Sequence, residues 1–96
     1  MRENLKRFNK IRLLAQTIKN EGFKREYNNI TLHVLQKAKI CSDDELGKYV
    51  NEAIQKIRGI ADTYQYIPNK CKNPDFSEHE KLFTLENYCN KSIQRL

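Results

Sequence analysis

The chain has 96 residues, of which 31% are charged and 39% apolar, and its formal net charge is +6. This length gives one hydrophobic core and leaves no room for a second. Uninterrupted apolar runs reach only two or three residues, which excludes a membrane-spanning helix. No apolar signal segment follows the start, so we expect no secretion by that route. The apolar content predicts a thin core that a partner or ligand helps to stabilise.

The positive charge is concentrated near the N-terminus. Residues 1–25 hold eight basic and two acidic side chains, which accounts for the whole net charge of +6. The other 71 residues carry ten charges of each sign. This asymmetry predicts an acidic partner for the first part of the chain.

Three helices are predicted in the first two thirds of the chain. The first spans about Glu3 to Asn20, with Gly22 as its stop, and the second ends at about Lys39. A capping box, Ser42-Asp-Asp-Glu45, opens the third and longest helix. The inward positions recur at three- and four-residue steps. In the first helix they are Leu5, Phe8, Ile11, Leu14, Ala15 and Ile18; in the second Tyr27, Ile30, Val34, Leu35 and Ala38; in the third Leu46, Tyr49, Val50, Ala53, Ile54, Ile57, Ile60, Ala61 and Tyr64.

Gly59 interrupts the apolar stripe of the third helix. A glycine inside a helix costs about 1 kcal/mol relative to alanine, so this one marks a close helix contact or a bend. After Tyr64 the chain reads as extended, with turns at the two prolines. A second capping box, Ser77 to Glu80, then opens a short terminal helix. Its inward face is predicted to consist of Leu82, Leu85, Cys89, Ile93 and Leu96.

These elements predict an all-α fold, an antiparallel three-helix bundle followed by an irregular C-terminal arm with a short fourth helix. Residues 1–64 would form the three-helix domain, and residues 65–96 the arm and its helix. The cysteines, Cys41, Cys71 and Cys89, match neither a metal-binding pair nor a disulfide framework. We expect reduced thiols, with a Cys71–Cys89 disulfide as the alternative.

No catalytic constellation is present in the sequence. There is no Gly-rich phosphate loop and no nucleophile elbow, and His33 and His79 lack metal-ligand spacing. Cys41 precedes a helix N-terminus, which can lower a thiol pKa, but it has no paired base. The sequence therefore predicts a protein that is not an enzyme and has no metal or cofactor of its own.

Two kinds of acidic partner fit the basic first helix. A nucleic acid would use Lys and Arg to neutralise phosphates, but the helix offers no exposed aromatics for stacking and no helix-turn-helix spacing. An acidic protein would use the strip formed by Arg2, Lys6 and Lys10, which are four residues apart beside the apolar stripe. We favour the protein partner, with a nucleic-acid-binding or mitochondrial-ribosome-associated protein as the alternative.

The order of these features resembles the LYR-motif (Leu-Tyr-Arg) family of small mitochondrial three-helix proteins. Lys10-Ile11-Arg12 lies at the tripeptide position, and Phe23 lies where the family has an aromatic residue. Tyr27 and Leu35-Gln36-Lys37 occupy the places of the second-helix tyrosine and Phe-Arg pair. The motif is degenerate, because only Arg12 matches it in identity.

The resemblance implies a function. Members of this family bind mitochondrial acyl carrier protein and act as accessory or assembly subunits, for which respiratory complex I is our first choice of host. The partner would supply an acyl-phosphopantetheine, and the arm would lie along a neighbouring subunit. The implied carrier contacts are Arg7, Lys10, Arg12 and Lys19. The implied acyl-chain channel is lined by Ile11, Leu14, Ile18, Val34, Leu35, Val50, Ile54 and Ile57.

Overall fold

The computed structural model describes residues 3–66 and 76–93, which form four α-helices and no strand. The helices are α1 (Glu3–Ala15), α2 (Glu21–Ala38), α3 (Asp43–Tyr66) and α4 (Phe76–Ser92). The predicted all-α fold is confirmed. None of the helices in these two ranges is long and apolar enough to cross a membrane.

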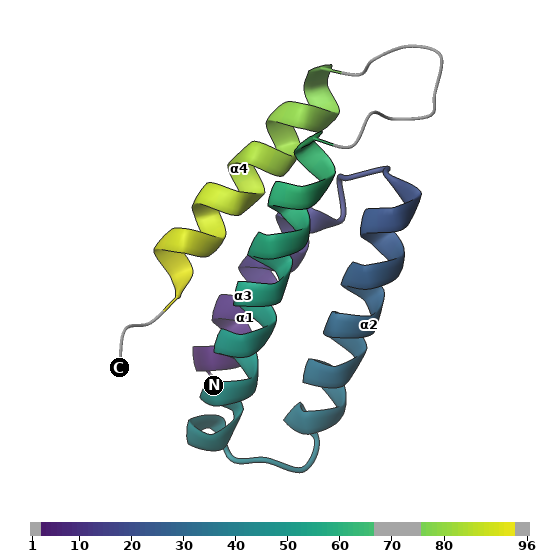
Figure 1. The fold of residues 1–96 in the computed structure, drawn as a ribbon. Coiled ribbons are helices and arrows are strands. Elements are labelled where there is room, and N and C mark those ends of the chain that lie inside the picture. Colours follow the sequence, from purple (N-terminus) through teal and green to yellow (C-terminus); the bar gives the residue numbers. More distant parts are fainter. Residues whose placement is uncertain (1–2, 67–75, 94–96) are drawn as a thin grey trace.

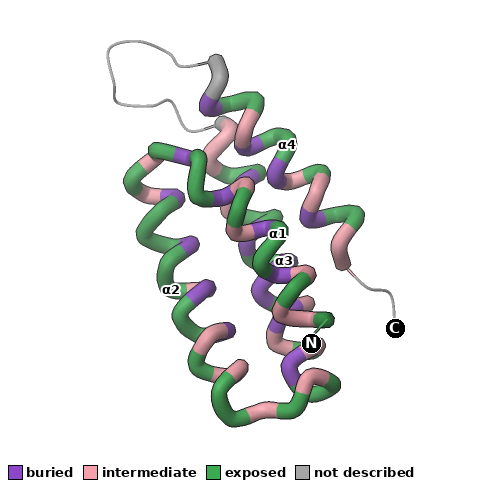
Figure 2. Tube along the Cα trace, turned by 180° about the vertical axis from the view of Figure 1, so that it is seen from behind, coloured by how far each residue is buried: buried purple, intermediate pink, exposed green. Residues whose placement is uncertain are grey.

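Helix α3 is the centre of the bundle. It packs against the other three helices, and α4 also packs against α1. Consecutive helices run in opposite directions, with α2 and α4 on either side of α3 in the view of Figure 1. Helix α1 lies behind α3 in that view and in front of it when the molecule is seen from the other side (Figure 2). The broad face formed by α2 and α3 is therefore turned away from α1.

All four helices contribute to one core. Their buried positions face inward along each helix, as Figure 2 shows. The buried apolar side chains are Phe8, Ile11, Ala15, Ile18, Phe23, Tyr27, Val34, Leu46, Val50, Ala53, Ile54, Ile57, Ala61, Leu82, Leu85 and Cys89. Burial of this apolar surface is the main term that stabilises the fold.

The end of α1 differs from the sequence prediction. The helix ends at Ala15, and two backbone bonds from Thr17 and Ile18 tighten the chain after it into a turn. Asn20 then caps α2, because its side-chain oxygen accepts the backbone N–H of Phe23 at 3.0 Å. Ile18 stays buried although it lies outside the helix. The apolar spacing thus predicted the inward face correctly, but it placed the end of the helix at about Asn20, beyond the turn that follows Ala15.

Gly22 lies in the first turn of α2 and does not end the first helix. A Cβ at this position would lie 2.7 Å from the hydroxyl oxygen of Tyr64. The Tyr64 ring also packs edge-on against Phe23, and its hydroxyl donates to Glu26 at 2.6 Å. The missing side chain of Gly22 therefore makes room for an aromatic contact between α2 and α3.

One of the two hydrogen bonds of the first predicted capping box is confirmed, the one that Ser42 accepts. The Ser42 hydroxyl oxygen accepts the backbone N–H of Glu45 at 3.3 Å, at the start of α3. The second differs from its prediction, because α4 begins at Phe76 and Ser77 is already helical. A difference of one or two residues at a helix end is small. The first turn of α4 is held by Glu78, whose carboxylate accepts the backbone N–H groups of Lys19 and Asn20.

Helix α4 is part of the bundle. It has 17 residues, and its inward residues Leu82, Leu85 and Cys89 are buried in the shared core. The predicted terminal helix is present, but it packs against α3 and α1 as part of the bundle, whereas the prediction placed it on an arm outside the three-helix domain. Residues 67–75 and Leu96, which the prediction also included, lie outside the described residues.

Candidate interaction surface between α1 and α4

A cleft between α1 and α4 brings basic side chains together. Lys6 and Lys10, four residues apart on α1, are exposed at its edge. Tyr88 and Ser92 line it from α4, and its volume is about 320 Å³. Glu3, Asn4 and Arg7 complete the lining. The predicted strip of Lys6 and Lys10 is therefore a surface next to an aromatic ring of another helix; Arg2 lies outside the described residues.

Arg7 holds the floor of this cleft in place. Its Nη1 atom donates to Asn51 Oδ1 of α3 and to the backbone oxygen of Ser92 on α4, both at 2.7 Å. The second bond places a cation at the C-terminal end of α4, where the helix dipole is negative. Burial lowers the pKa of Arg7 from its usual value, and the charge of Asp43 opposes this shift. Arg7 therefore joins three helices.

Asn4 extends the same network to the start of α3. Its side-chain nitrogen donates to the Asp43 backbone oxygen at 2.8 Å, and its oxygen accepts from Arg7 Nη2 at 2.9 Å. The backbone N–H of Asn4 also donates to an Asp43 carboxylate oxygen at 3.2 Å. The cleft thus rests on polar contacts that fix the relative positions of α1, α3 and α4.

The four predicted carrier contacts do not form one surface. Arg7 and Lys10 line the cleft, but Arg12 is two residues beyond Lys10 and so projects from another side of α1. Arg12 is half-buried and donates to Asn9 Oδ1 at 3.3 Å. Lys19 is exposed in the turn between α1 and α2. The resemblance thus grouped side chains that lie on different sides of α1 and in the turn after it.

A buried carboxylate fixes that turn against α4. Glu78 is 5% exposed, and its Oε1 atom accepts the backbone N–H groups of Lys19 and Asn20 at 2.6 and 2.8 Å. Lys81 adds a bond from its amine to the Thr17 backbone oxygen at 3.3 Å. The α1–α2 turn is therefore held by the first turns of α4, about 60 residues later in the chain.

The predicted channel residues lie in the packed core. Six of them are fully buried, and Leu14 and Leu35 are half-buried. The cavities at the α1–α4 and α2–α3 seams are lined by other side chains. A channel through the predicted residues would require the helices to move apart.

Sequence reasoning missed Asn4, Tyr88 and Ser92 as parts of the cleft. Tyr88 and Ser92 are more than 75 residues from Lys10, and no local pattern indicates that α4 returns to α1. Within the described ranges, no group of three or more His, Cys, Asp or Glu residues is placed to hold a metal ion. His33 is exposed on α2, and its ring packs edge-on against Tyr49 of α3 with 5.8 Å between the ring centres.

Comparison with known proteins returned no match. No family model fits the chain, and no curated protein or solved structure is similar to it. The function proposed below is therefore argued from the residues, the cleft and the motif resemblance.

Proposed function

We propose that this protein is a non-catalytic helical adaptor that binds an acidic partner protein at the α1–α4 cleft. The observation that carries the proposal is the pairing of exposed Lys6 and Lys10 beside Tyr88, on a floor fixed by Arg7. Ammonium groups on such a rim attract carboxylates or phosphates and accelerate association. The tyrosine ring supplies apolar contact area with a polar tip, as at many protein interfaces.

The motif resemblance supports one class of partner, an acylated mitochondrial acyl carrier protein. Its acidic surface would meet Lys6 and Lys10, and it would bring its own acyl-phosphopantetheine. Since the predicted channel residues are packed in the core, the acyl chain would enter only if helices separate. In this proposal the protein is an accessory or assembly subunit of a mitochondrial complex, with respiratory complex I as the first candidate.

Charge reversal at the cleft tests the proposal. The double variant Lys6→Glu, Lys10→Glu should weaken binding of a purified acyl carrier protein by about tenfold or more at low salt, equivalent to about 1.4 kcal/mol. The loss should shrink as salt screens the charges. Surface plasmon resonance over a salt series measures both effects.

The matched control is Lys24→Glu, Lys39→Glu, which makes the same change in net charge at exposed positions outside the cleft. It should bind like the wild type. Equal losses in both double variants would show that only net charge matters and would contradict a site at the cleft. Co-purification with intact mass spectrometry identifies the partner: retained RNA without an acylated carrier would favour the nucleic-acid alternative.

A further inference from the structure

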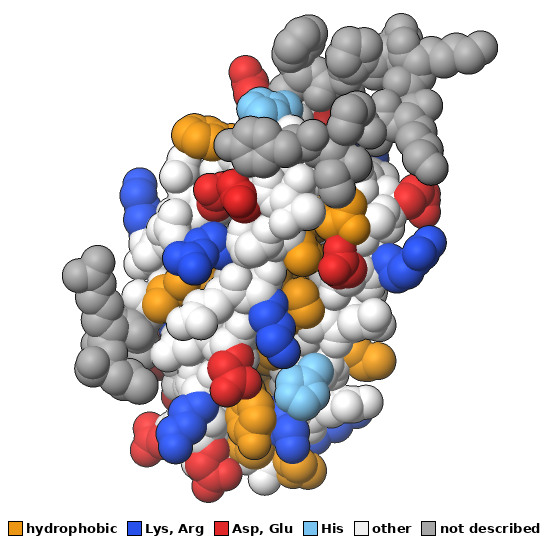
Figure 3. All heavy atoms as spheres, in the orientation of Figure 1, with side chains coloured by type: hydrophobic (Ala, Val, Ile, Leu, Met, Phe, Trp, Pro, Cys, Tyr) orange, Lys and Arg blue, Asp and Glu red, His pale blue; other side chains and the backbone are white. Residues whose placement is uncertain are grey.

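A second surface, on the face turned away from α1, has a different character. Two adjoining cavities of about 180 and 470 Å³ follow the seam between α2 and α3 and share Asn29, Ile30 and Lys56. Their apolar floor is formed by Ile30, Ala53 and Ile60. Figure 3 shows hydrophobic side chains exposed down the middle of this face, with charged groups of both signs beside them. We call these two cavities the α2–α3 groove.

Gly59 lines this groove and has no close contact with another helix among the described residues. It is exposed, its φ is not positive, and a Cβ built on it would meet nothing within 4 Å among the described residues. A glycine inside a helix lowers helix stability relative to alanine. The close helix contact that the sequence offered as one reading of Gly59 is therefore absent from the part of the chain that the structure describes, and the position is open to approach from outside.

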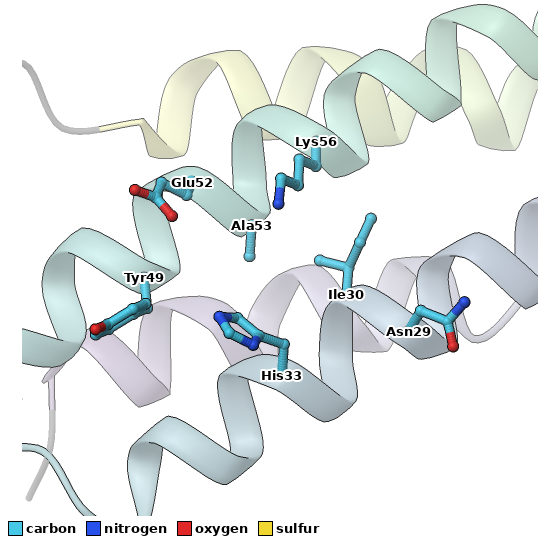
Figure 4. A pocket seen from close by; sticks show the side chains of 7 residues that line it. All are labelled: Asn29, Ile30, His33, Tyr49, Glu52, Ala53 and Lys56. Carbon is cyan, nitrogen blue, oxygen red and sulfur yellow. The ribbon is translucent and has the colours of Figure 1, made fainter.

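The charge on the groove decides which partner fits. Glu26, Glu52 and Lys56 are its charged lining residues, and the Lys37 amine lies 5.1 Å from the ring centre of Tyr49, so the groove carries charges of both signs. A second copy of a protein with net charge +6 therefore meets carboxylates as well as ammonium groups here. In the close view of the groove, Glu52 and Lys56 project from α3 one turn apart (Figure 4). This arrangement of one acid and one base on a helix is self-complementary under two-fold symmetry.

We propose that the α2–α3 groove binds a second copy of this chain, with the two α3 helices antiparallel across a two-fold axis at the level of Ile54. Glu52 and Lys56 are each two residues from Ile54, so each Glu52 lies opposite Lys56 of the second copy. Tyr49 and Gly59 are each five residues from Ile54, so the same register places each Tyr49 opposite Gly59 of the second copy. One register thus pairs opposite charges and a large side chain with the open glycine. The inference does not depend on the proposed function.

Complementary charge reversal tests this arrangement directly. Wild-type protein should form a dimer in a concentration series followed by sedimentation equilibrium. Glu52→Lys and Lys56→Glu should each be monomeric, because like charges then face each other twice. An equimolar mixture of the two variants should form a heterodimer, because positions 52 and 56 then join a lysine of one variant to a glutamate of the other at both contacts across the axis.

Two further variants separate loss of association from loss of folding. Gly59→Leu should remain folded by circular dichroism, since its side chain enters open space, but should weaken the dimer at least tenfold. Lys24→Glu, which lies outside the groove, should dimerise like the wild type. A wild type that stays monomeric up to about 1 mM overturns the proposal and leaves the groove to a different protein. A dimer that survives both single reversals, or a mixture that fails to associate, also overturns it.

Discussion

At the scale of single residues, the bundle depends on a few polar groups in unusual surroundings. Arg7 and Glu78 each connect backbone or side-chain groups of distant segments, with bonds of 2.6–2.8 Å. Tyr27 and Thr31 are the opposite case. Each is buried on α2, and neither hydroxyl has a hydrogen-bond partner among the described residues. A buried polar group without a partner lowers stability by its desolvation.

Thr31→Val is therefore expected to stabilise the protein. Valine keeps the shape of threonine and removes the unpartnered hydroxyl, so the free energy of unfolding should rise by about 1 kcal/mol. Urea unfolding measures the change. The control is Thr17→Val: this hydroxyl is exposed and donates to the Leu14 backbone oxygen, so the change should stay within about 0.5 kcal/mol. A destabilised Thr31→Val protein would show that the hydroxyl has a partner in solution.

At the scale of elements, the ends of the helices are set by contacts between them. The start of α2 has its own cap, Asn20, but the backbone N–H groups of Lys19 and Asn20 are bound by Glu78 of α4. Helix α1 stops where this turn begins. The turn and α4 therefore stabilise each other, although the sequence separates them by two helices.

Glu78→Gln should weaken this connection. The amide keeps one acceptor oxygen but loses the charge and places an N–H₂ group at the buried Oε2 position, which has no partner among the described residues. We expect a loss of about 1–3 kcal/mol in the free energy of unfolding, with faster hydrogen exchange at Lys19 and Asn20. Glu80→Gln, two residues on and exposed, is the control and should have little effect. Unchanged exchange at both amides would contradict the contact.

At the scale of the whole molecule, the two surfaces lie on different faces. The cationic cleft belongs to α1 and α4, and the near-neutral groove belongs to α2 and α3. In the proposed dimer, α1 of each copy faces outward, so two partner-binding clefts would remain accessible. Binding of an acidic protein and self-association would then be compatible, because they use different helices.

Global stability should fall in alkaline solution. Burial raises the pKa of the Cys89 thiol to about 12, whereas an unfolded cysteine titrates at about 8.5. Between these values the unfolded state releases a proton that the folded state retains, so stability is full below about pH 8.5 and declines toward pH 12. The slope from this group approaches ~1.4 kcal/mol per pH unit.

Cys89→Ala removes that contribution. The variant is less stable at neutral pH because of the cavity that it creates, but its free energy of unfolding should fall less steeply above about pH 9 than that of the wild type. Urea unfolding at several pH values gives the two slopes, and their difference isolates Cys89 from other titrating groups. Parallel slopes would show that Cys89 ionises in the folded protein as it does in the unfolded chain.

The sequence by itself determined the helices and their inward faces, because apolar spacing and local capping are properties of neighbouring residues. It predicted Ser42 as a cap and the buried face of α4 correctly. It also located the positive charge in the first part of the chain. These features need no knowledge of distant contacts.

Only the tertiary structure decided which side chains share a surface. In the folded protein Arg7 bonds to α3 and α4, and Arg12 lies on a different side of α1 from Lys10. Glu78 of α4 binds the turn before α2. It also left Gly59 open in a groove between α2 and α3. These outcomes depend on how the helices pack around α3, and packing joins residues more than 40 positions apart that no local pattern relates.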